Sequence, residues 1–131
     1  MSALVVDTSS WIAYFAGAAR PAIEEALEEG RAWLPAVVAA ELLSGRLTAR
    51  QRRRLTSLLD DLPLAPFDRG HWVRVGSLRA FLRGKGVAVS TPDAHVAQCA
   101  LDLGAELLTE DRVFRLVASH TDLRLAATSG P

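Results

Sequence analysis

The stretch STPDAHVAQCALDLGAELLTEDRVF, residues 90–114, decides the fold, because its pattern predicts a helix followed by a buried strand. Thr91 can cap the helix, and the first turn then holds a proline and Asp93, since the fixed φ of proline suits that position. Small residues at helical spacing continue as far as Gly104 and would let the helix lie close against a sheet. Residues 105–109 then form an apolar run of strand length. The stretch therefore predicts one helix–strand unit of an α/β fold.

Acidic residues occupy the two ends of this helix–strand unit. Asp93 lies in the first helical turn, and Asp111 comes just after the strand. A helix N-terminus and a strand C-terminus can present both carboxylates on one edge of a sheet, where the ligand sites of open α/β proteins gather. Both aspartates are therefore candidate functional residues.

Asp7 has an equivalent position near the start of the chain. Residues 3–6 form a continuous apolar run that ends at Asp7, which is typical of a central parallel strand buried on both faces. Capping the following helix would be an ordinary role for Asp7, but Thr8, Ser9 and Ser10 offer hydroxyls for that task. The position at a strand end therefore favours a functional role.

Glu41 stands alone in an apolar segment. Pro35 opens this predicted helix, whose other positions are mostly valine, alanine and leucine. Because burying an unpaired charge is costly, Glu41 needs either a cation or a pairing with an arginine. The sequence leaves both alternatives open.

Alternating strands and helices predict a three-layer α/β/α, Rossmann-like fold with a central, mostly parallel sheet of about four or five strands. Four acids then approach the same sheet edge: Asp7, Glu41, Asp93 and Asp111. Carboxylates that converge without a basic partner repel one another unless a cation joins them. All-oxygen ligands favour Mg²⁺ or Mn²⁺ over zinc, and such a site can activate water against a phosphodiester. The acids therefore predict a magnesium-dependent nuclease.

Length and composition limit the class of protein. Residues 1–131 suffice for one domain, and half of them are hydrophobic, enough for a real core. No segment has the apolar length to span a bilayer and no secretion signal opens the chain, so we expect a cytoplasmic protein without a membrane partner. Cys99 is expected as a small buried hydrophobe, and residues 128–131 as a frayed tail.

The histidines provide no zinc motif. His71, His95 and His120 are scattered along the chain and lack the close pairing of zinc ligands. His95 follows Asp93 closely, which leaves an accessory role open, but a surface or capping position is the expectation for it.

The basic residues are all arginine except Lys85, and the formal net charge is zero, so total charge neither favours nor excludes a nucleic-acid partner. A basic run follows Gly45, and its candidate RNA-contacting residues are Arg46, Arg50, Arg53 and Arg54. Such side chains can track a phosphate backbone, form a solvated face or meet an acidic partner chain. The sequence does not choose among these alternatives.

Several motifs together resemble one family, the PIN-domain ribonucleases of the VapC toxin type. The motifs are Val5-Val6-Asp7-Thr8-Ser9 with Trp11, residues 35–38 with Glu41-Leu42 and Gly45, Pro92-Asp93-Ala94 with Ala97, Ala100 and Gly104, and Leu108-Thr109-Glu110-Asp111 before Phe114. The resemblance covers nearly the whole chain. It implies a PIN-like fold and the toxin of a type II toxin–antitoxin module.

The resemblance also implies roles for individual residues. Magnesium would be held, directly or through water, by Asp7, Glu41, Asp93 and Asp111, and a metal-activated water would cleave RNA. Hydrogen bonds to the carboxylates or metal waters would come from Thr8 or Ser9 and from Thr109. The family implies a homodimer, within a larger toxin–antitoxin assembly in some cases, and a cognate antitoxin that inhibits it. Some members carry a further acid where this chain has Val113, which bears on a second metal site.

Two other functions compete with this interpretation. Aspartyl-phosphate phosphatases need an aspartate two residues after the first acid, where this chain has Ser9. Receiver domains of the same group need paired acids near the first strand and a lysine after a late strand, and the only lysine is Lys85. A catalytically silent module that binds RNA or a partner is the remaining alternative, and the four acids argue against it.

Overall fold

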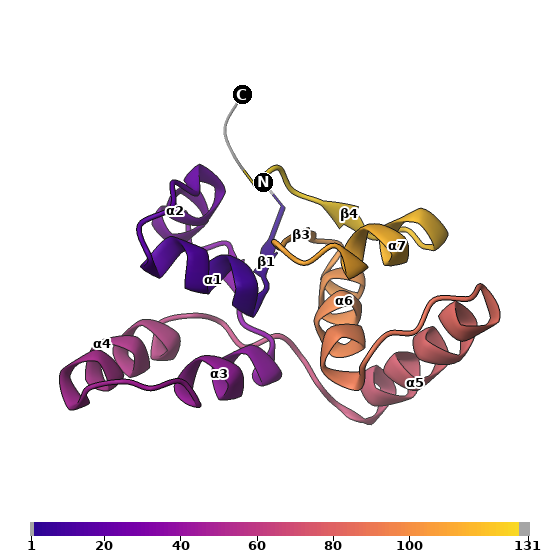
Figure 1. Ribbon diagram of the computed structural model, residues 1–131, viewed down its shortest axis with the longest axis horizontal. Helices are drawn as coiled ribbons and strands as arrows, with labels where there is room; N and C mark the ends of the chain where they lie inside the picture. The colour runs from indigo at the N-terminus through magenta and orange to yellow at the C-terminus, as the bar shows by residue number, and fades with distance from the viewer. Residues whose placement is uncertain (1, 129–131) are drawn as a thin grey trace.

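The computed structural model describes residues 2–128, and within them a parallel sheet of four strands runs in the order β2-β1-β3-β4. Figure 1 labels three of these strands, β1, β3 and β4. The strands are β1 (Leu4–Val6), β2 (Ala32–Trp33), β3 (Glu106–Leu108) and β4 (Arg124–Leu125). The central strand β1 is buried along its whole length, as its apolar run predicts. Of the predicted frayed tail, residues 129–131 lie outside the described residues.

Seven helices connect and cover these strands within residues 2–128 (Figure 1). They are α1 (Thr8–Phe15), α2 (Pro21–Glu28), α3 (Ala36–Leu43), α4 (Ala49–Asp60), α5 (Arg69–Gly84), α6 (Thr91–Leu103) and α7 (Val113–His120). The predicted α/β class with its parallel sheet is confirmed. None of these helices has the length and apolar character needed to cross a membrane. That residues 1–131 form one domain stays a prediction.

Helix α6 lies at the centre of the molecule, against the sheet and beside α5 (Figure 1). Every residue from Ala94 to Ala100 is buried, because small side chains let the helix approach β1 and β3 closely. The helix ends at Gly104, whose φ of 61° is left-handed. The predicted cap is wrong by one residue: Ser90, not Thr91, accepts the hydrogen bond from the Asp93 N–H at 3.2 Å. Both hydroxyl residues can cap, so the pattern does not distinguish them.

The strand order creates a switch point between β1 and β3. The chain passes from β1 to β2 on one side and from β3 to β4 on the other. The parallel register sets Val6 beside Leu108, and the N–H of Asp7 donates to the carbonyl oxygen of Leu108 at 2.9 Å. Ligand sites of open α/β sheets lie outside the strand carboxyl ends at such a point. Asp7 and the loop after β3 therefore meet where a site is expected.

The segment at residues 63–67 is an extended connection. It pairs with the residue after β2 through one parallel bridge, between Leu34 and Leu64. Pro63 and Pro66 lack the backbone N–H donors that a regular strand would need.

Candidate active site

Asp7 is buried at the end of β1 and is held by side-chain hydrogen bonds. Its side chain is 6% exposed, and its Oδ2 accepts hydrogen bonds from Ser9 Oγ at 2.8 Å and Thr109 Oγ1 at 2.9 Å. Although Asp7 occupies the N-cap position of α1, its carboxylate makes no capping hydrogen bond. The carboxylate of Asp7 is thus oriented by two side-chain hydroxyls and does not cap the N-terminus of α1.

The two hydroxyls that hold Asp7 are themselves fixed by the loop after β3. Ser9 Oγ accepts from the N–H of Glu110 at 2.9 Å, and Thr109 Oγ1 accepts from the N–H of Asp111 at 3.0 Å. Each hydroxyl has one proton, which it gives to Asp7, and lone pairs that receive the loop N–H groups. The start of α1 and the loop after β3 therefore form one connected frame around Asp7.

Glu41 lies on the exposed side of α3, which corrects the expectation of a charge enclosed by apolar neighbours. Val38 and Leu42 provide the buried face of this short helix, so Glu41 faces outward. Its Oε1 accepts a hydrogen bond from Thr8 Oγ1 at 2.7 Å. Among the residues that the structure describes, no arginine pairs with Glu41. The cost of burying a charge therefore gives no reason for Glu41 to bind a cation. Its hydrogen bond to Thr8, at the start of α1, places it near Asp7.

The pKa of Asp93 is affected by the three other acids. The pKa of its carboxyl is raised, first because burial penalises the charged form and then because Asp111, Asp7 and Glu41 repel it; the Ser90 hydroxyl acts in the opposite direction. The three other acids are therefore close enough to disfavour the same negative charge. Asp93 joins them from the first turn of α6, where the helix N-terminus carries partial positive charge.

Two neighbouring acids after β3 differ in their surroundings. Asp111 is exposed, and its Oδ1 accepts the N–H of Val113 at 3.1 Å, next to the start of α7. Glu110 instead receives two hydrogen bonds from Arg20, at 3.1 and 2.6 Å, and one from Ser10 at 2.8 Å. Arg20 lowers the pKa of Glu110. The sequence did not reveal the Arg20 contact, because these residues are far apart in the chain.

Within residues 2–128, no ion pair supplies a counter-charge to the four candidate acids. None of the four ion pairs in residues 2–128 includes Asp7, Glu41, Asp93 or Asp111. Each of these carboxylates keeps at least one oxygen to which no described residue donates. Within residues 2–128, no three of these acids bring their oxygens close enough together to form a ready-made metal site. The donor chemistry fits Mg²⁺, which keeps several waters and needs few direct carboxylate ligands.

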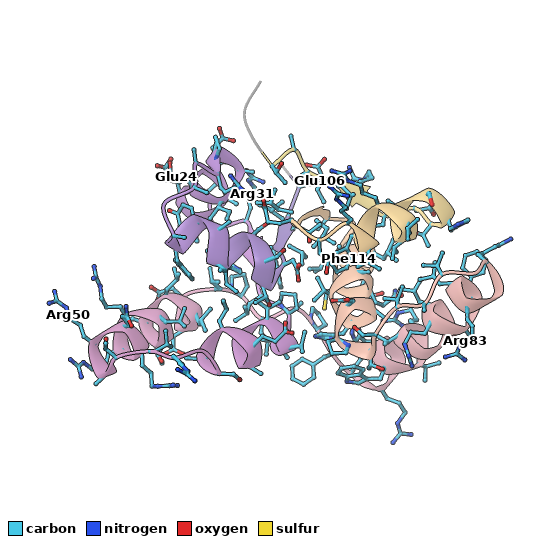
Figure 2. The ribbon with its side chains drawn as sticks, in the orientation of Figure 1. Glu24, Arg31, Arg50, Arg83, Glu106 and Phe114 are labelled. Carbon is cyan, nitrogen blue, oxygen red and sulfur yellow. The ribbon has the colours of Figure 1, made fainter. Side chains whose placement is uncertain are left out.

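The arginine cluster lies on and before α4. Its four candidate residues are all exposed, and Figure 2 shows Arg50 pointing outward from α4. Arg54 lines a groove of about 440 Å³ together with Phe15, Leu55 and Leu58, so part of the cluster borders an apolar surface. Contact with RNA stays a prediction for Arg46, Arg50, Arg53 and Arg54.

Two of the three histidines, His71 and His95, are paired in the structure, although their sequence spacing gives no sign of it. His71 and His95 are buried against each other, with Nε2 of His71 at 2.7 Å from Nδ1 of His95. Burial, followed by electrostatic repulsion from the neighbouring His71 imidazole, lowers the pKa of His95 to about 4. The surface or capping position expected for His95 is therefore wrong. The pairing depends on α5 crossing α6, which no local spacing encodes.

The fold is thus an open parallel α/β sheet with a cluster of carboxylates at its switch point, and no described cationic side chain pairs with Asp7, Glu41, Asp93 or Asp111. The profile of the PIN domain matches residues 4–119, and the chain belongs to the PIN-domain family. Nucleases of this family depend on metal ions and act on RNA phosphodiester bonds. The family recognised from the sequence motifs is confirmed.

Named relatives and solved structures agree with this assignment. Ribonuclease VapC11 of Mycobacterium tuberculosis is 29% identical over 131 residues, which span 95% of this chain and 98% of the relative. A DNA-bound VapBC structure from Salmonella typhimurium matches with a TM-score of 0.75 at 21% identity, over 96% of this chain and 98% of that chain. FitAcB from Neisseria gonorrhoeae matches with a TM-score of 0.73 at 17% identity, over 95% and 97%. At these identities the structural matches show a shared fold.

Proposed function

We propose that this chain is the toxin of a type II toxin–antitoxin module and a magnesium-dependent endoribonuclease. The observation that carries the proposal is the set of four uncompensated carboxylates, three of which raise the pKa of the fourth, Asp93. Relatives named VapC ribonuclease and fold neighbours titled VapBC support the same conclusion. The residues that hold the cation are Asp7, Glu41, Asp93 and Asp111.

The chain's own residues prepare this site before a cation arrives. Ser9 and Thr109 fix Oδ2 of Asp7 and leave its Oδ1 free, and Thr8 does the same for Glu41 by binding Oε1. When bound, Mg²⁺ supplies positive charge that offsets the charge developing on a phosphodiester and makes water a better nucleophile; Mn²⁺ can substitute. The free energy of cation binding is favourable because the cation relieves the repulsion among the four acids.

Partners follow from the same assignment. A cognate antitoxin would inhibit the chain, and a homodimer is the expected unit, within a larger toxin–antitoxin assembly. The cytoplasm is the expected location, since RNA is the substrate. The exposed Arg46, Arg50, Arg53 and Arg54 are the residues we assign to RNA phosphate contact, because the described part of the chain offers them no acidic partner.

The test is cleavage of structured RNA by the purified chain, free of antitoxin, with Mg²⁺ and then with chelator. We expect cleavage that chelation stops and that Asp111→Asn removes. Glu110→Gln is the matched control, because it changes the adjacent acid that Arg20 already neutralises. Metal-independent cleavage would contradict the mechanism. RNA binding without turnover over a broad RNA panel would instead identify the catalytically silent module.

A further inference from the structure

A second cluster of ligand atoms lies between α5 and α6. His71, His95 and Cys99 are each at most 1% exposed, and one ligand atom from each lies within 4.8 Å of the other two. We propose that these three residues form a binding site for a thiophilic divalent cation, Zn²⁺ in the first instance, which fastens α5 to α6. This proposal is independent of the ribonuclease assignment.

The residue types suit zinc and not magnesium. His95 and Cys99 are four residues apart on α6, so they face the same side of the helix, and Sγ lies 3.9 Å from Nδ1 and 3.8 Å from Nε2 of His95. His71 adds a second imidazole from α5. Imidazole nitrogen and thiolate sulfur are the ligands that Zn²⁺ prefers, whereas Mg²⁺ prefers oxygen. Three protein ligands leave the fourth tetrahedral position for water.

The Asp102 carboxylate orients His71 in the way that carboxylates orient metal-binding histidines. Oδ2 of Asp102 lies 2.8 Å from Nδ1 of His71, which keeps the proton on Nδ1 and turns the lone pair of Nε2 toward His95. Asp102 is itself fixed by Arg74, at 2.8 and 3.0 Å, and by Gln98 at 2.8 Å. These contacts match the protein part of a carboxylate–histidine–metal arrangement, in which outer partners set the tautomer of the ligand.

Binding one cation would require adjustments in the spacing of the three ligand atoms, which already lie within 4.8 Å of one another. The His71 Nε2 and His95 Nδ1 atoms are 2.7 Å apart, whereas a tetrahedral Zn²⁺ separates two ligand nitrogens by about 3.4 Å. The rings therefore move apart by a fraction of an ångström, and the shared proton of His95 moves from Nδ1 to Nε2. Burial raises the pKa of the Cys99 thiol to about 12, so binding releases one thiol proton to solvent for each cation.

The surroundings shield the cluster and link it to the acidic site. The Trp72 ring stacks on His95 with centroids 4.8 Å apart and planes 13° from parallel. Helix α6 carries His95 and Cys99, and it presents Asp93 in its first turn. A cation bound here would therefore stabilise the helix that presents a catalytic candidate, without taking part in cleavage.

Cobalt is the spectroscopic probe, because Co²⁺ takes zinc sites and a cobalt–thiolate bond has a charge-transfer absorption. The full chain, stripped of metal with chelator, is titrated with Co²⁺. We expect a thiolate charge-transfer band that saturates at one equivalent and that Zn²⁺ abolishes. Cys99→Ala should remove the band, and Asp102→Asn should weaken Co²⁺ binding by about 10-fold to 100-fold. Asp93→Asn is the matched control and should keep the band, because it alters only the acidic site.

Three results would overturn the proposal. One is a folded wild-type chain with no charge-transfer band at saturating Co²⁺. Another is a band that persists in Cys99→Ala, or in Cys99→Ser if the alanine variant fails to fold by circular dichroism. The third is cobalt binding that Asp93→Asn abolishes and Cys99→Ala leaves unchanged, which would assign the cation to the acidic edge.

Discussion

Replacing Thr109 by valine should loosen Asp7 without creating a cavity, because the two side chains have nearly the same shape. Thr109 is 9% exposed, donates to Oδ2 of Asp7 at 2.9 Å and accepts from the N–H of Asp111 at 3.0 Å. Removing a hydrogen bond to a charged group costs about 1.5–3 kcal/mol, so Thr109→Val should lower the free energy of unfolding by about 2 kcal/mol. The melting temperature should fall by about 5–10 °C.

The assay is urea unfolding of the metal-free chain at neutral pH, followed by RNA cleavage with Mg²⁺. Thr109→Ser keeps the hydroxyl and is the matched control, which should stay close to the wild type. Cleavage by Thr109→Val should fall about 10-fold to 100-fold, because Thr109 orients a carboxylate that we assign to the cation. If the free energies of unfolding of Thr109→Val and the wild type differ by less than about 0.5 kcal/mol, the hydrogen bond from Thr109 to Asp7 does not contribute the predicted stability.

Three further predictions concern charge. Asp93→Asn should raise the free energy of unfolding of the metal-free chain at neutral pH, because the raised pKa of Asp93 means that folding disfavours its charged carboxylate. The added stability should vanish as the pH falls and the wild-type Asp93 becomes protonated. Added stability that stays constant across pH would refute this prediction. Asp111→Asn should remove RNA cleavage while Glu110→Gln retains it, and equal activities would contradict the separation of these acids. The last prediction concerns the exposed arginines on α4 and replaces Arg50, Arg53 and Arg54 by alanine. RNA binding should weaken and the slope of log K against log salt should flatten by about 2, whereas an unchanged slope would assign the cluster to solvent or a partner chain.

The sequence predicted the parts of the site that follow from strand ends. Asp7 comes directly after an apolar strand and Asp111 shortly after another, and parallel pairing alone brings such ends together. Asp93 was predicted for a similar reason, since a helix that packs on those strands begins at the same edge. These inferences required only local patterns and the rules of parallel sheets.

Other features depend on contacts between distant segments. The exposure of Glu41 is decided by which face of α3 packs inward, and several faces of that helix are apolar. Glu110 and Asp111 are adjacent in sequence, but only the folded chain shows that Arg20 neutralises the first. The His71–His95 pair likewise requires α5 to cross α6. Local spacing holds no information about such crossings.

The central claim is that four separate carboxylates hold one kind of divalent cation. Titration of the full chain with Mn²⁺, followed by electron paramagnetic resonance of the free ion, tests this claim most directly. The account predicts saturable binding that Mg²⁺ competes for and that both Asp7→Asn and Asp93→Asn weaken at least about tenfold. Equal Mn²⁺ affinity in the wild type and these two variants would contradict it.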